Sequence, residues 1–127
     1  MAHSKKLQFI LNKLYELNPD KIELKLDRVQ RLVSDLGNPH KKLKNVITVT
    51  GTNGKGGVAF YLKEILQTHG YTVSLFQSPF LYNFLTRFLI NGKPLDEEKF
   101  INLVIDVDKV NNNQDITFFE YITCIAF

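Results

Sequence analysis

The sequence has no tryptophan, one methionine and one cysteine, Cys124, among its 127 residues. A single cysteine excludes an intrachain disulfide and a cysteine-based metal site, and the apolar residues around Cys124 predict a buried, inert thiol. Glycine and proline are scarce, with 7 and 4 residues, whereas 44% of the residues are hydrophobic. These proportions exclude collagen-like, low-complexity and disordered chains. The length suits one domain or part of one.

Long apolar runs are also missing, and none approaches the ~18 residues that cross a membrane. The N-terminus leads straight into an amphipathic pattern, without the apolar core of a signal peptide. Lys and Arg number 16 and Asp and Glu 13, giving a net charge of +3. The basic cluster at 41–44 lacks the interleaved aromatic residues that stack on bases. We therefore expect a cytoplasmic protein that binds neither membranes nor nucleic acid.

The N-terminal part has the pattern of two helices. Apolar residues recur at helical spacing over 7–17, where Ser4 is a suitable cap, and again over 26–36. The second helix should end at Gly37, because glycine is favoured just past a helix and Pro39 disfavours helical geometry before it.

The middle of the chain has the pattern of a βαβ unit. A β-branched run at 46–50 predicts a buried strand, which leads into a glycine-rich loop. A helix over 58–69, with Ile65 among its inward residues, and a strand over 71–76 should follow. This order implies two parallel strands joined by a right-handed crossover.

Turn and cap residues organise the remainder. A strand at 88–90 should turn sharply at Asn91-Gly92, and Asp96 should cap the next helix. Thr117 and Glu120 have the spacing of a capping box that opens a final helix. Two parallel strands are few for such a sheet. We therefore expect an α/β fold with an incomplete parallel sheet.

The glycine-rich loop carries the clearest functional signal. It reads Gly51-Thr52-Asn53-Gly54-Lys55-Gly56-Gly57. Glycines let several backbone N–H groups converge on one phosphate, the following helix N-terminus adds a positive field, and Lys55 adds a full charge. The strict Walker A spacing is not met, since Val49 stands where its first glycine belongs. Phosphate binding is favoured over a plain glycine-rich turn.

Five segments in order resemble one family, the folylpolyglutamate and dihydrofolate synthases among the Mur-type ATP-dependent ligases. Besides the loop with its preceding Val49-Thr50, they are 36–39 (Leu-Gly-Asn-Pro), 70–73 with 78–81 (Gly-Tyr-Thr-Val and Ser-Pro-Phe-Leu), 90–92 (Ile-Asn-Gly) and 117–121 (Thr-Phe-Phe-Glu-Tyr). The resemblance implies a P-loop domain with a Mur-ligase-like parallel sheet, preceded by two helices. It divides the chain into a helical segment, 1–44, and a truncated ATP-binding domain, 45–127.

The resemblance also implies a reaction of folate biosynthesis and one-carbon metabolism. ATP would phosphorylate the carboxylate of folate or dihydropteroate, and the amine of L-glutamate would attack the acyl phosphate. Residues 51–57 would bind ATP, and the Ser78 hydroxyl would bind Mg²⁺. The pterin would face two groups of residues, Glu23, Leu24 and Lys25 together with Thr117, Phe118, Phe119 and Glu120. The residues alone also allow a simple turn at Ser78-Pro79 and a purely capping role for Glu120.

Three positions depart from the family's pattern. Gly57 replaces a hydroxyl residue after Lys-Gly, Thr86 stands where an acid is usual, and Lys25 replaces a glycine. By resemblance, the chain is an N-terminal fragment that lacks the downstream metal ligands and the C-terminal glutamate-binding domain. We expect it to be inactive alone, and no residue is assigned a catalytic role. A separately encoded C-terminal half would complete it; the alternatives are a non-catalytic remnant and a P-loop phosphate-binding module.

The same truncation predicts exposed apolar surface. We expect unpaired strand edges at 46–49 or 71–76, and exposed Phe118, Ile122 and Ile125 on the last helix, so that the chain self-associates.

Overall fold

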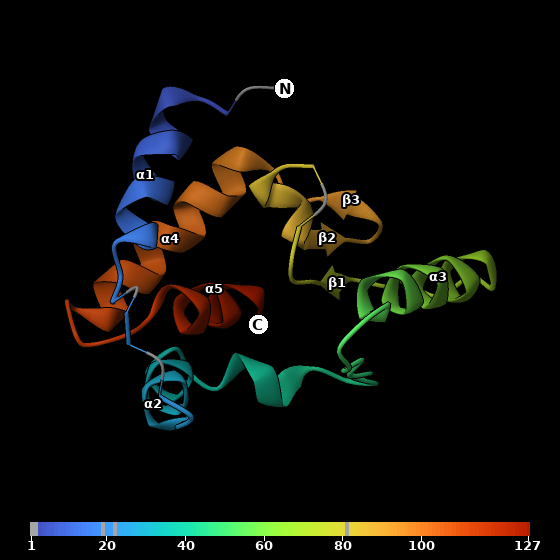
Figure 1. The fold of residues 1–127 in the computed structure, drawn as a ribbon, viewed down its shortest axis with the longest axis horizontal. Coiled ribbons are helices and arrows are strands. Elements are labelled where there is room, and N and C mark those ends of the chain that lie inside the picture. The colour runs from blue at the N-terminus through green and yellow to red at the C-terminus, as the bar shows by residue number, and fades with distance from the viewer. Residues whose placement is uncertain (1–2, 19, 22, 81) are drawn as a thin grey trace. The chain divides into compact units, whose positions relative to one another are not determined.

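The computed structural model describes residues 3–18, 20–21, 23–80 and 82–127 (Figure 1). Five α-helices, two 3₁₀ helices and three short strands follow one another in the described part of the chain. In order they are α1 (Lys5–Tyr15), α2 (Asp27–Asp35), η1 (Pro39–Lys42), α3 (Lys55–Thr68), β1 (Leu75–Phe76), η2 (Phe84–Arg87), β2 (Phe88–Ile90), β3 (Lys93–Pro94), α4 (Glu97–Asn111) and α5 (Phe118–Ala126).

The contacts divide the chain into two compact units. Met1–Lys44 and Ile101–Phe127 form the first, and Asn45–Phe100 forms the second, so the division falls inside α4. The first unit is helical in its described residues, and the second carries the glycine-rich loop and the three strands.

The caps predicted for the first unit are confirmed. The Ser4 side chain accepts a hydrogen bond from the Leu7 N–H at the start of α1. After α2, Gly37 has a φ of +85°, and the N–H groups of Gly37 and Asn38 donate to the carbonyls of Ser34 and Val33. This pair of bonds is a Schellman motif, which explains why glycine follows the helix.

Helix α5 is an apolar helix of the first unit, and one of its faces is buried there. Thr117 and Glu120 form the predicted capping box at its start. Tyr121, Ile122, Cys124 and Ile125 are buried, and α5 packs against α2. The buried thiol is thus confirmed, whereas the expected exposure of Ile122 and Ile125 is wrong, because α2 lies against this helix. Phe118 is half-buried against Tyr15, with ring centroids 4.7 Å apart.

The sheet of the second unit is antiparallel and small (Figure 1). Strand β2 pairs with β1 on one side and β3 on the other. The β2–β3 hairpin turns at Asn91 and Gly92, whose φ angles of 49° and 81° belong to the predicted tight turn. Phe84 packs edge-on against Phe88 and Phe100, with centroid distances of 5.9 and 5.3 Å. This aromatic cluster forms the core of the unit.

The predicted parallel pair is wrong for the residues described. Residues 46–50 form no strand, and Val46 and Ile47 are 67% and 59% exposed. Of 71–76, only Leu75 and Phe76 are paired, and they pair antiparallel with β2. A β-branched run suits a strand interior, but a strand exists only when a neighbour satisfies its backbone groups. None of the segments described pairs with 46–50.

Helix α3 also differs from its prediction. It begins at Lys55 rather than Val58, so it includes Gly56 and Gly57. Ile65, predicted to point inward, is 56% exposed, whereas Lys63 is only 4% exposed. The Lys63 ammonium group donates to Gln67 Oε1 at 3.0 Å, pairs with Glu64 and lies over the Phe60 ring. These partners compensate the burial of its charge.

Candidate functional site

The glycine-rich loop runs directly into the N-terminus of α3. Gly54 is the N-cap residue, with φ +77°, and Gly51 has φ +151°. Both backbone conformations are ones that side-chain-bearing residues rarely adopt, so the two glycines are required by the turn. Lys55 is the first residue of this 14-residue helix. A helix start leaves its first N–H groups without intrahelical acceptors, which suits an anion.

The remaining glycines of the loop have a different explanation. A Cβ placed on Gly56 or Gly57 would meet no atom within 4 Å, and both residues are helical. Neither glycine is therefore required by packing among the described residues. The space beside Gly57 would accommodate the hydroxyl that the family resemblance leads one to expect.

Ser78 lies in a loop whose two ends, Gln77 and Arg87, are hydrogen-bonded to each other. The backbone N–H of Gln77 donates to the Arg87 carbonyl, and its side-chain amide donates to the Thr86 carbonyl, both at 3.0 Å. Arg87 is buried and lies over the Phe80 ring, 5.3 Å from its centroid. The loop that carries Ser78 is thus held at its base by Gln77 and Arg87, to which the sequence analysis assigned no role.

The metal-ligating capacity of the described residues is small. They contain no group of three or more His, Cys, Asp or Glu side chains that could hold a metal ion. The Ser78 hydroxyl is a hard oxygen donor of the kind Mg²⁺ accepts, but Mg²⁺ sites of this type also use substrate phosphates. The donor set fits Mg²⁺ only together with a bound nucleotide.

The residues predicted to face a pterin lie in the first unit, and Arg28 joins two of them. Its Nε and Nη2 donate to the two carboxylate oxygens of Glu120 at 2.8 and 2.9 Å. Its Nη1 donates to Glu23 Oε2 at 2.9 Å. Only 14% of the Arg28 side chain and 15% of the Glu120 side chain are exposed. This bidentate pair is partly desolvated, which strengthens its electrostatic interaction.

The titration behaviour of this group follows from those contacts. Partial burial alone would raise the pKa of Glu120, but hydrogen bonds from Arg28 and Thr117 outweigh it, and the net pKa is lowered. The hydrogen bond to Glu120 is the main reason why the pKa of Arg28 is raised. The pair is therefore ionised throughout the physiological range.

The other residues predicted to face the pterin differ in their exposure and in their contacts. Leu24 is fully exposed and Lys25 is exposed. Phe119 is 50% exposed. Thr117 is committed to the cap of α5.

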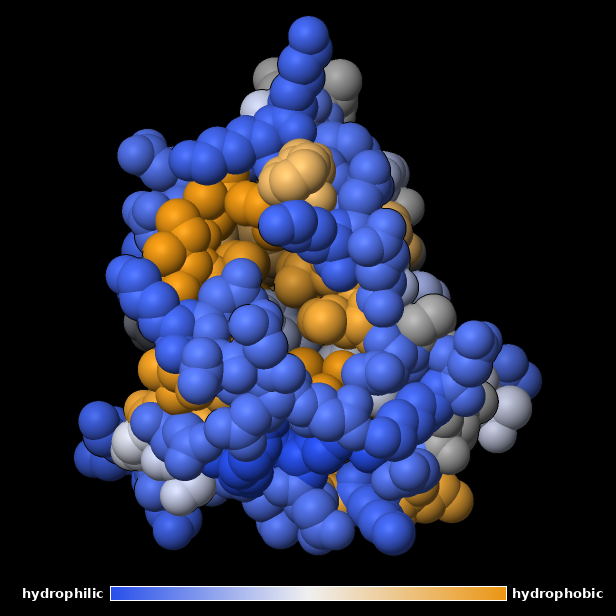
Figure 2. Space-filling view, turned by 90° about the vertical axis from the view of Figure 1, so that its left-hand side faces the viewer, coloured by the Kyte–Doolittle hydropathy of each residue, from blue (hydrophilic) through white to orange (hydrophobic). Residues whose placement is uncertain are grey.

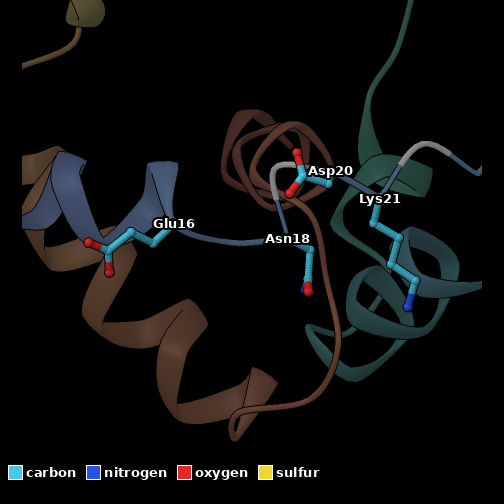
Figure 3. A pocket seen from close by; sticks show the side chains of 4 residues that line it. All are labelled: Glu16, Asn18, Asp20 and Lys21. Atoms are coloured by element: carbon cyan, nitrogen blue, oxygen red, sulfur yellow. The ribbon is translucent and has the colours of Figure 1, made fainter.

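A second set of polar contacts ties the turn after α1 to the segment that precedes α5. The Asn18 side chain donates to Asp115 Oδ1 at 2.7 Å and to the Ile116 carbonyl at 3.0 Å, and Lys21 pairs with Asp115. Glu16, Asn18, Asp20 and Lys21 line a hollow of about 370 Å³ there (Figure 3). Asn18 and Lys21 already pair with Asp115, so we interpret this hollow as the surface of a stabilised turn and not as a ligand site.

Sequence reasoning assigned no role to Arg28, Gln77 or Arg87. The Arg28–Glu120 pair spans 92 positions, so no local pattern could indicate it. The signal that existed was indirect, because Arg28 follows closely on a segment, 23–25, that the family resemblance already assigned to the substrate.

The chain is similar to curated proteins of one family. The chain is 38% identical over 108 residues to dihydrofolate synthetase of Saccharomyces cerevisiae, covering 84% of this chain and 25% of that protein. It is 37% identical over 109 residues to dihydrofolate synthase/folylpolyglutamate synthase of Bacillus subtilis, covering 80% and 25%. The chain thus spans about a quarter of the length of these relatives. It matches no protein-family model.

Solved structures give the same result. Folylpolyglutamate synthase of Thermotoga maritima matches 98% of this chain with 30% of its own, at a TM-score of 0.86 and 33% identity. The bifunctional synthase of Yersinia pestis, complexed with AMPPNP and Mn ion, matches 94% with 29% of its own, at a TM-score of 0.80 and 31% identity. E. coli FolC in complex with DHPP and ADP matches at a TM-score of 0.82 and 32% identity, covering 94% and 29%. The chain belongs to the folylpolyglutamate synthase/dihydrofolate synthase family.

Among the described residues, no helix is both long enough and apolar enough to cross a membrane.

Proposed function

We propose that this chain is the part of an ATP-dependent ligase of folate metabolism that binds nucleotide phosphates and faces the pterin. The observation that carries the proposal is the loop 51–57, which turns on two positive-φ glycines directly into α3 with Lys55 at the helix start. Relatives solved with ADP or AMPPNP support a nucleotide as the ligand. The complete reaction joins L-glutamate to folate or dihydropteroate.

Each part of the chain has a task in this proposal. The free N–H groups at the start of α3 and the Lys55 charge hold the terminal phosphates of ATP. Mg²⁺, when bound with ATP, supplies charge neutralisation at the phosphates. Ser78 provides one oxygen for that ion, and the closed loop 77–87 holds Ser78 in place. The segments 23–25 and 117–120 face the pterin.

Titration calorimetry with MgATP tests the nucleotide site. The full chain should bind MgATP weakly, and Lys55→Ala should weaken binding by about tenfold or more, because a charge-assisted contact to phosphate is lost. Lys99→Ala is the matched control, since Lys99 is an exposed lysine in the first turn of another helix, α4. Equal binding by the Lys55→Ala chain would contradict the proposed site.

The departure at Gly57 favours a second candidate, a P-loop phosphate-binding module without ligase turnover. The two candidates differ in a coupled phosphate-release assay with dihydropteroate or tetrahydrofolate. We expect no glutamate-dependent release from this chain alone above a Lys55→Ala control. Pyrophosphate that binds as tightly as MgATP would favour the simple module, and glutamate-dependent release would show a complete ligase.

A further inference from the structure

We propose that Arg28 is a positioning residue, which holds the segment 23–25 against the first turn of α5 and thereby assembles the substrate-facing surface of the first unit. The nature of the ligand, a pterin, rests on the proposed function. The role of Arg28 as a clamp rests on its own contacts.

The clamp has three arms of nearly equal length. Arg28 lies in the first turn of α2, and its guanidinium group donates twice to Glu120 and once to Glu23, at 2.8, 2.9 and 2.9 Å. A planar guanidinium can serve two carboxylates at once, because its donors are fixed in a fork. The result is one continuous group of charges that joins the neighbouring segments 23–25 and α2 to α5, which lies about ninety positions further along the chain.

The same contacts define what Glu120 does. Its Oε2 accepts from the Thr117 N–H at 2.9 Å as well as from Arg28 Nε, and its Oε1 accepts from Arg28 Nη2. Both oxygens are therefore engaged within the protein. Glu120 therefore anchors Arg28, and the side chains next to it contact the ligand.

Those neighbours are apolar and exposed. Leu24 follows Glu23 in the chain and is fully exposed, and Phe119 precedes Glu120 and is 50% exposed. Arg28 fixes the residues beside both of them. A flat heterocycle could pack on such side chains while its polar edges contact backbone groups. If the clamp opens, the loop at 23–25 is no longer tied to α5, and the surface loses its shape.

A lysine at position 28 distinguishes the effect of the bidentate geometry from the effect of the positive charge. Arg28→Lys keeps the positive charge but cannot form the bidentate bond to Glu120 while reaching Glu23. Arg31→Lys is the matched control. Arg31 lies on the same helix, and its Nη2 donates to Asn111 Oδ1 at 2.8 Å rather than to either predicted substrate segment.

The experiment combines ligand titration with hydrogen exchange on the full-length chain. Dihydropteroate should bind the Arg28→Lys chain about tenfold or more weakly than wild type, because the untied segment 23–25 must then be ordered when the ligand binds. Arg31→Lys should bind as wild type. Glu120→Gln combined with Arg28→Lys should be no weaker than Arg28→Lys alone, because the two residues act as one unit. MgATP affinity should be the same in all four chains.

Hydrogen exchange keeps the test independent of the ligand. The amides of Glu120 and Tyr121 in the first turn of α5, which donate to Thr117, should exchange faster in Arg28→Lys than in Arg31→Lys. If wild type binds no dihydropteroate, the pterin part of the proposed function fails, and exchange alone decides whether Arg28 is a clamp. Equal exchange in the two variants, or equal dihydropteroate affinity, would overturn the role of Arg28.

Discussion

Glu120 shows how one carboxylate can link local and distant structure. It closes the capping box with Thr117, three residues away, and it pairs with Arg28, which lies 92 positions away. The capping box was predictable, since its spacing is visible in the sequence. The ion pair was not predictable, because nothing in the local sequence around either residue indicates that the two side chains pair.

This pairing predicts a dependence of stability on pH. The pKa of Glu120 is lower in the folded chain than its ordinary value, so the folded state favours the charged form. The contribution to stability is complete above the unfolded pKa of about 4.3 and is lost as the pH falls through the folded pKa. The difference in Tm between wild type and Glu120→Gln should thus be largest above about pH 5 and shrink toward pH 3.

Thermal unfolding by circular dichroism from pH 3 to pH 7 measures this difference. Glu98→Gln serves as the control, because Glu98 is an exposed first-turn carboxylate of α4. A Tm difference for Glu120→Gln that stays constant with pH would contradict the role assigned to the pair.

Cys124 offers a second prediction on a single residue. Burial raises the pKa of its thiol to about 11, and the nearby charge of Glu120 adds to the effect. At pH 8 about one thiol in a thousand is then the reactive thiolate. Alkylation by iodoacetamide should be much slower in the native chain than in urea at the same pH. Mass spectrometry follows the reaction, and equal rates in both conditions would show that Cys124 is accessible.

At the scale of elements, the local signals were reliable and the pairing signals were not. Ser4, Gly37, the Asn91-Gly92 turn and the capping box each involve groups a few residues apart, and each is confirmed. The strand expected at 46–50 depends on a neighbour, and hydrophobic pattern alone does not say whether that neighbour is present. The antiparallel pairing of β1 with β2 likewise depended on residues about twelve positions further along.

The start of α3 yields a prediction about the phosphate site. Gly57 is the third residue of this helix, and a side chain there meets open space. Gly57→Ser should tighten MgATP binding by on the order of 1–3 kcal/mol, because the hydroxyl adds one hydrogen bond to phosphate or one oxygen ligand to the metal. Titration calorimetry measures the change.

Gly57→Ala is the matched control for this variant. Alanine also raises helix propensity relative to glycine, by up to about 1 kcal/mol, but brings no hydroxyl. Equal tightening in the two variants would assign the effect to helix stability, and no tightening in either would mean that the glycine does not impair the site.

At the scale of the molecule, the chain leaves apolar side chains uncovered. Hydrophilic residues dominate the face in Figure 2, with apolar patches between them. In the second unit, Val46, Ile47, Val58, Tyr61, Ile65 and Tyr71 are all more than half exposed. The chain spans about a quarter of its relatives' length. Family membership and the local caps were predictable from the sequence. The pairing of the strands was not, because it depends on which segments are present to pair.

The exposed run at 46–50 leads to the last prediction, which concerns self-association. Unpaired backbone groups flanked by β-branched side chains are a template for pairing with another chain. Sedimentation velocity should show wild type associating as its concentration rises, and Ile47→Lys should shift it toward monomer, because a charge at this position opposes strand pairing. Ile105→Lys, at an exposed apolar position of α4, should leave the association unchanged. A clean wild-type monomer with a sharp two-state melt would contradict the prediction, since it would mean that these residues stay apart in spite of their exposure.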